Sequence, residues 1–151
     1  MREIKYRFYD KRVKKMYYPT PSQISFFINA CMQDRYKNVI IPMQATGIFD
    51  STKFKDLSEK EQKKFLLTND KDSWRGYEIY EGDVTAIRYD KERTEYGVVS
   101  YYKGGFSKGC TALSSYQKFT KIVGNLFEGY PEEANYSVNF YKKNHEEALW
   151  L

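Results

Sequence analysis

The chain opens with alternating apolar and polar positions. Every second residue from Ile4 to Phe8 is apolar or aromatic, and the residues between them are charged. A period of two is typical of a half-buried strand. The polar run Asp10–Lys15 interrupts the alternation, and Met16–Tyr18 resumes the apolar pattern. We therefore expect two strands joined as a hairpin.

The stretch that follows predicts the best helix in the chain. Thr20 can cap it, Pro21 suits its first position, and Gln23 completes a capping box. Apolar residues then recur at i, i+3, i+4 and i+7, namely Ile24, Phe27, Ile28 and Cys31. We expect this stripe to pack onto a sheet. Its cysteine would then be a buried structural thiol rather than a reactive one.

A third apolar run covers residues 38–47 and ends at Gly47. It contains Pro42, which has no backbone N–H to donate to a neighbouring strand. The run is therefore expected to be an edge strand, or a strand interrupted by a bulge.

Residues 49–75 are strongly charged. Within them, Ser58 and Glu61 form a second capping box, which predicts a short helix through about Leu67. This helix is polar on most faces. Residues 53–72 are therefore expected to be an insertion or a projecting element rather than part of the core.

Short β-strands are expected in most of the remaining chain. Turn signals separate four runs at close spacing, which favours a small barrel or a sandwich. These runs are residues 84–89, 96–102, 112–119 and 122–127. The tail beyond them starts with a Pro-Glu-Glu turn and ends in the amphipathic piece NHEEALWL. The pattern as a whole predicts an α+β protein that is mainly β.

The 151 residues suit one domain, or one compact domain with an appendage. We expect four parts along the chain. They are an N-terminal hairpin, helix and strand in residues 1–50, a charged helical insertion in 51–75, a β-barrel in 76–130, and a C-terminal tail with helical character in 131–151.

Composition and charge favour a contact surface over a dedicated nucleic-acid binder. Aromatic residues make up 18% of the chain, including 15 Tyr and 10 Phe, and this suits both β-structure and interfaces. The net charge is +5, which favours acidic partners. It is not the dense, clustered charge of a nucleic-acid-binding domain.

The cysteines and the histidine do not predict a metal site. Cys31 and Cys110 belong to no C-x-x-C pair, and His145 cannot complete a zinc site with them at familiar spacing. The two cysteines could form one disulfide or remain as two reduced thiols. A reducing compartment favours the thiols. No cofactor is expected. The sequence has no secretory signal at its start and no apolar run of about 20 residues, so we expect a soluble, cytoplasmic protein without a membrane partner.

The stretch YEIYEGDVTAIRY contains three acids, Glu78, Glu81 and Asp83, that could form a catalytic or metal-binding cluster. Such a cluster needs a base, a nucleophile or further ligands, and none accompanies it in the sequence. A turn explains Gly82 and Asp83 equally well, because glycine adopts positive φ and aspartate bonds backbone amides of its own turn. We therefore expect a structural turn at these two residues. We do not expect the protein to be an enzyme.

Two basic stretches raise the alternative of anion binding. The glycine-rich run from Lys103 to Gly109 lacks the spacing of a phosphate-binding loop and is expected to be a hairpin loop. The N-terminal hairpin interleaves cations with aromatic rings, which a nucleic-acid surface needs. The candidate residues of that surface are Lys5, Arg7, Lys11, Arg12, Lys14 and Lys15.

Four pieces of the chain together resemble the YopX-like family, small proteins of phages and prophages of Gram-positive bacteria. They are MREIKYRFYD with KKMYY, then PMQATGIFD, then YEIYEGDV, and finally IVGNLFE. The resemblance spans roughly residues 1–130, and EIYEGD is its most specific piece. It implies a mixed β-protein with a helix, an SH3-like β-barrel around the EGD motif, and self-association. The family has no established catalytic residues to carry over.

The chain departs from this family in two places. The connection between MQATG and EIYEGD is short in the family, whereas here it holds the charged helix, and the tail beyond Glu128 is longer. Loops on a rigid scaffold often carry recognition. We therefore expect a non-catalytic, phage-encoded protein that binds another protein, such as a host defence or regulatory protein. The candidate contact residues are Lys53, Lys55, Glu59, Lys60, Lys63, Lys64, Trp74 and Arg75.

Overall fold

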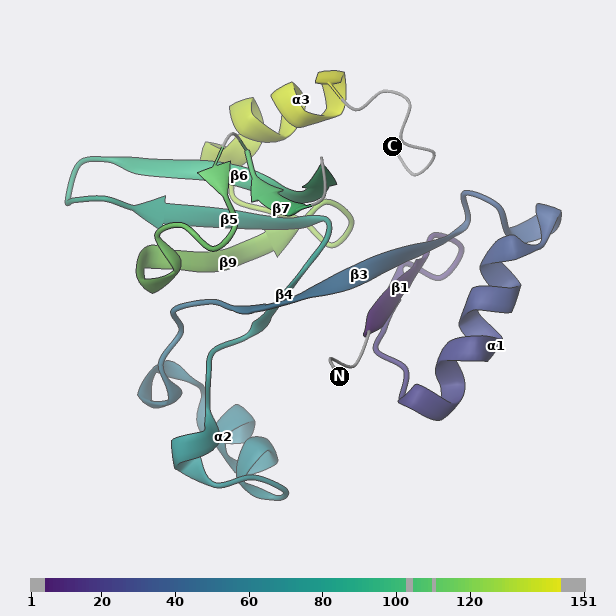
Figure 1. The fold of residues 1–151 in the computed structure, drawn as a ribbon, viewed down its shortest axis with the longest axis horizontal. Coiled ribbons are helices and arrows are strands. Elements are labelled where there is room, and N and C mark those ends of the chain that lie inside the picture. The colour runs from purple at the N-terminus through teal and green to yellow at the C-terminus, as the bar shows by residue number, and fades with distance from the viewer. Residues whose placement is uncertain (1–4, 103–104, 110, 145–151) are drawn as a thin grey trace.

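The computed structural model describes residues 5–102, 105–109 and 111–144 (Figure 1). Over these residues the protein is α+β and mainly β, with nine strands in two antiparallel sheets and three α-helices. This confirms the predicted class. Predictions for Ile4, for the loop at 103–104, for Cys110 and for the tail from His145 onward lie outside the described residues.

The first sheet has the strand order β2-β1-β3-β4. Its strands are β1 (Tyr6–Asp10), β2 (Lys15–Tyr17), β3 (Ile40–Phe49) and β4 (Glu78–Tyr80). The long strand β3 pairs with β1 in its first half and with β4 in its second. Pro42 lies in the first half, opposite Phe8 on β1. The missing N–H of Pro42 therefore falls where β3 has a paired strand on one side only.

The second sheet has the order β8-β7-β6-β5-β9 and curls as a half-barrel (Figure 1). Its strands are β5 (Asp83–Arg88), β6 (Thr94–Tyr102), β7 (Gly105–Lys108), β8 (Thr111–Ala112) and β9 (Thr120–Asn125).

The prediction of a strand over residues 112–119 is wrong. Strand β8 ends at Ala112, and a turn followed by the short 3-10 helix Gln117–Phe119 takes up the rest of this range. Two local features break the extended chain there. Leu113 turns into the core, where it is 1% exposed. Tyr116 adopts a left-handed φ of 57°, which no residue of a regular strand adopts.

Helix α1 (Pro21–Met32) begins as its capping signals predict. The Gln23 side chain accepts a hydrogen bond from the Thr20 amide at 3.1 Å. The apolar stripe, however, is only partly covered. Phe27 stacks on Phe8 with 5.0 Å between ring centroids, but no residue of the helix is buried. The predicted burial of Cys31 is therefore only partial; its thiol is half-buried, which raises its pKa.

Helix α3 (Asn135–Asn144) covers the second sheet (Figure 1). Its Val138 packs with Val84 and Val98 of that sheet, and all three side chains are buried. The first part of the predicted tail is thus a helix that completes a hydrophobic core.

Helix α2 (Glu59–Leu66) is the helix predicted within the charged stretch, and its predicted bounds were right to within one residue. The Ser58 hydroxyl accepts a hydrogen bond from the Glu61 amide at 3.2 Å, as a helix cap does. The helix lies away from both sheets (Figure 1) and buries none of its side chains. Within the described residues, no helix is long and apolar enough to cross a membrane.

A candidate binding groove beside the inserted helix

Residues 51–75 lie between β3 and β4 and are called the inserted segment below. They follow directly on a buried carboxylate. Asp50, at the end of β3, is 4% exposed and accepts four hydrogen bonds. Two come from Thr52, through its amide at 3.1 Å and its hydroxyl at 3.0 Å. The amides of Tyr77 and Ile122 donate the others, at 2.9 Å and 3.1 Å. Asp50 therefore joins both ends of the inserted segment to strand β9.

An aromatic cluster fixes the rest of the inserted segment. The Trp74 indole packs edge-on against Phe65 of α2 and against Tyr77, with ring centroids 5.2 Å and 5.3 Å apart. Its Nε1 donates to the Thr52 carbonyl at 2.8 Å. The Tyr77 hydroxyl in turn donates to the Glu61 carboxylate. These contacts give α2 one position on the scaffold although none of its residues reaches the core.

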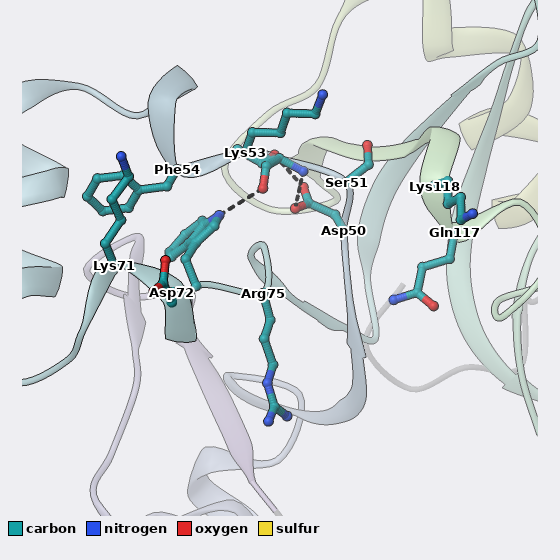
Figure 2. Close-up of a pocket in the computed structure, with 11 residues that line it drawn as sticks. Asp50, Ser51, Lys53, Phe54, Lys71, Asp72, Arg75, Gln117 and Lys118 are labelled. Carbon is teal, nitrogen blue, oxygen red and sulfur yellow. Dashed lines mark hydrogen bonds between the residues drawn. The ribbon is translucent and has the colours of Figure 1, made fainter.

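An open groove of about 830 Å³ lies where the two ends of the inserted segment meet the 3-10 helix before β9 (Figure 2). Phe54 and Trp74, both half-buried, contribute its aromatic surface. Its remaining lining is polar or charged and consists of Asp50, Ser51, Thr52, Lys53, Lys71, Asp72, Arg75, Gln117 and Lys118.

Four exposed cations surround this groove, and Figure 2 shows them on different sides of it. They are Lys53, Lys71, Arg75 and Lys118. Across the described part of the chain, none of the four lies within ion-pair distance of a carboxylate. The Nζ of Lys71 lies 5.7 Å from the centroid of the Phe54 ring. The groove therefore presents positive charge that the fold does not neutralise.

Some of the contact residues predicted from the sequence lie at this groove. Of the predicted contact residues, Lys53, Trp74 and Arg75 line the groove. The others, Lys55, Glu59, Lys60, Lys63 and Lys64, are exposed on the 3-10 helix Phe54–Asp56 and on α2 and do not line it. Sequence reasoning missed Phe54, Lys71, Gln117 and Lys118. The first two belong to the charged stretch already singled out, but no local signal links Gln117 and Lys118 to it.

The predicted basic surface of the N-terminal hairpin is not assembled. Arg7 is 3% exposed, so it must be removed from that surface. The side chain of Arg7 extends from β1 to the second sheet, where its Nη2 lies 2.8 Å from Asp83 Oδ1. Two further cations are paired, Lys5 with Glu78 at 3.6 Å and Arg12 with Asp10 at 2.8 Å. The remaining three, Lys11, Lys14 and Lys15, are exposed around the turn.

The three acids of the EGD stretch have separate structural partners. Asp83 Oδ2 accepts from the Tyr80 amide at 2.8 Å across a turn in which Gly82 has a φ of +84°. Glu81 Oε1 accepts from the Gln44 amide at 3.0 Å, and its burial raises its pKa. Over the described residues, no three His, Cys, Asp or Glu side chains gather to hold a metal ion.

This turn also joins the two sheets. The Glu81 amide donates to Gln44 of β3 at 3.0 Å, and the Gly82 amide donates to Val99 of β6 at 2.9 Å. Consecutive amides thus bond to different sheets, and the chain passes from one sheet to the other at this point.

Comparison with known proteins gives no family assignment. No family model matches the chain, and no curated protein matches it. Among solved structures, the chain is similar to the crystal structure of protein EF1440 from Enterococcus faecalis. The two share 16% sequence identity with a TM-score of 0.49, and the match covers 85% of this chain and 96% of EF1440.

Proposed function

We propose that the protein is a non-catalytic binding protein that contacts another protein through the inserted segment. One observation carries the proposal: the tip of α2 is held in place yet displays apolar side chains to solvent. Leu66 is 48% exposed and Leu67 is 82% exposed, next to the exposed lysines Lys63 and Lys64. Apolar residues bordered by charge are typical of a protein-binding patch.

The anchoring of α2 supports this proposal. A segment that only linked β3 to β4 would need neither the Trp74 hydrogen bond to Thr52 nor the aromatic cluster. Ordering a projecting helix costs conformational entropy, and a helix fixed in advance loses less of it on binding. The inserted segment is therefore built like a pre-organised contact element.

The wider setting of the proposal is a phage- or prophage-encoded member of the YopX-like family acting in the bacterial cytoplasm. A host defence or regulatory protein is the partner that this setting suggests. That part rests on the sequence resemblance and on analogy. The non-catalytic role draws support from the EGD acids, whose carboxylates accept backbone amides of the fold.

Site-specific photo-crosslinking tests the proposal. We would place a photoreactive phenylalanine analogue at Leu67, and as a control at Lys91, an exposed residue of the turn between β5 and β6. In cells that express the protein, Leu67 should give a discrete protein adduct that Lys91 does not give. The Lys63→Glu and Lys64→Glu changes together should weaken that adduct. Equal labelling from both positions would contradict the proposal.

Self-association is a second proposal, and helix α1 favours it. Residues 16–33 carry no charge although 30% of the chain is charged. Phe26 and Met32 of this helix are 73% and 78% exposed. An uncharged face is where two copies of a chain with a net charge of +5 can meet without repulsion. We propose that two copies pack through α1.

The alternative of nucleic-acid binding through the hairpin has lost support, because Arg7 is buried and Lys5 and Arg12 are paired. It predicts binding that weakens steeply with salt. A gel-shift titration with single- and double-stranded DNA and RNA at low salt would revive it if the Lys11→Glu change reduced the affinity.

A further inference from the structure

We infer that the groove between the two ends of the inserted segment binds an acidic, carboxylate-rich segment of the partner protein. This inference rests on the proposed function, because the groove adjoins the same inserted segment. Hydrogen-bonding groups that the groove leaves unused indicate the chemistry of the partner.

The neutral donors of the groove are largely occupied within the protein. Trp74 Nε1 bonds to the Thr52 carbonyl, and the Thr52 hydroxyl bonds to Asp50. Gln117 Nε2 bonds to the Phe49 carbonyl at 2.9 Å. What remains to bind a ligand is mainly the ammonium and guanidinium groups of Lys53, Lys71, Arg75 and Lys118. These groups donate and cannot accept, so a matching ligand must supply acceptors.

The two acids of the groove do not cancel its positive charge. Asp50 is buried, and its two oxygens already accept four hydrogen bonds from the protein. Asp72 is exposed and is the remaining negative side chain of the lining. Four cations against one exposed carboxylate leave a positive site, and hydrogen bonds from Arg or Lys to a carboxylate are the stronger, charge-assisted kind.

A peptide fits this groove better than a nucleic acid does. The cations lie on different sides of a compact groove (Figure 2), whereas a nucleic-acid strand needs a charged track along its backbone. Phe54 and Trp74 add an apolar surface for the side chains between the carboxylates.

Fluorescence anisotropy with two labelled probes tests the inference. The probes are an oligo-glutamate peptide and an oligothymidylate of matched charge, titrated from low salt to physiological salt. We expect the peptide to bind more tightly than the oligonucleotide, with an affinity that falls as salt rises. Tighter binding of the oligothymidylate, or peptide binding that salt does not weaken, would overturn the inference.

Charge-reversal variants locate the binding. Arg75→Glu combined with Lys118→Glu should weaken peptide binding about tenfold, since each exposed ion pair contributes modestly. Lys91→Glu combined with Lys143→Glu changes the net charge equally at exposed positions away from the groove and should change affinity less than twofold. Equal losses in the two double variants would contradict a site at the groove. Thermal melts confirm that both variants fold, and Arg75→Gln with Lys118→Gln replaces the first one if it does not.

The failure of this inference can be told apart from failure of the proposed function. If oligo-glutamate does not bind but the photoreactive group at Leu67 still captures a protein, the acidic partner is wrong and the contact role stands. If neither experiment gives binding, both are wrong.

Discussion

Arg7 on β1 and Asp83 on β5 form a buried ion pair between the two sheets, with Nη2 and Oδ1 2.8 Å apart and both side chains nearly inaccessible to solvent. The guanidinium also donates to the Glu81 carbonyl at 3.2 Å and packs against the Tyr80 ring. The pair therefore lies at the turn through which the chain passes from one sheet to the other.

Removing Arg7 should destabilise the protein strongly. Arg7→Met would leave the Asp83 carboxylate buried without its cation, which costs about 3–5 kcal/mol of unfolding free energy. Adding Asp83→Asn should recover part of the loss, because the asparagine oxygen still accepts from Tyr80. Urea unfolding of the single and double variants measures this. Arg93→Met, which breaks the exposed pair with Glu95, is the control and should cost less than about 1 kcal/mol. Purely additive losses in the double variant would argue against the pair.

The contribution of Glu81 to the free energy of unfolding should fall as pH rises. Burial raises its pKa, although the Gln44 amide partly opposes this. A carboxyl group with a raised pKa in the folded state contributes stability below its unfolded pKa of about 4.3, and that contribution is lost as pH rises through the folded pKa. Glu81→Gln, which keeps an oxygen for Gln44, should therefore be more stable than the natural protein at pH 7, with the difference vanishing near pH 4. Thermal melts at both pH values measure it. Glu92→Gln, at an exposed turn, should show no such trend.

Asp50→Asn should loosen the base of the groove. The amide nitrogen would replace an oxygen that now accepts two hydrogen bonds, so donors would face donors. We expect a loss of about 3 kcal/mol, with faster hydrogen exchange in residues 51–77. Asp72→Asn, at an exposed position of the same groove, should change neither quantity. Normal protection of the inserted segment in Asp50→Asn would contradict the role of Asp50 as its anchor.

Two glycines with similar backbone angles should respond differently to alanine. Gly76 has a φ of +105°, and a Cβ there would lie 2.1 Å from the Asp50 carbonyl oxygen. Gly129 has a φ of +122° with no atom within 4 Å of such a Cβ. Gly129→Ala should cost about 1–2 kcal/mol through backbone strain alone, and Gly76→Ala should cost clearly more. Chemical denaturation compares them, and equal costs would contradict the close approach to Asp50.

The exposed face of α1 predicts a change in size in solution. Phe26→Glu with Met32→Glu should leave the single copy folded, because both side chains are exposed and glutamate suits a helix. Light scattering should find a dimer for the natural protein and a monomer for this variant. A monomeric natural protein at all concentrations would show that this face does not join two copies.

Much of the fold was determined by local sequence patterns. The capping residues of α1 and α2 and the turn residues at Gly82 act over a few positions, so the sequence by itself revealed them. It also singled out the charged stretch that contributes Lys53, Trp74 and Arg75 to the groove. Short-range hydrogen bonding and side-chain periodicity are sufficient for such predictions.

Only the tertiary structure decided how Arg7 and Lys118 are used. Arg7 lies in a strongly charged stretch and Lys118 in a nearly uncharged one, and nothing near either residue in sequence shows how it is used. The packing of the two sheets buries Arg7 against Asp83, 76 positions along the chain. The path of the chain into β9 brings Lys118 to the inserted segment. Whether a cation is buried and paired or exposed and free depends on long-range packing, and local sequence carries no record of that.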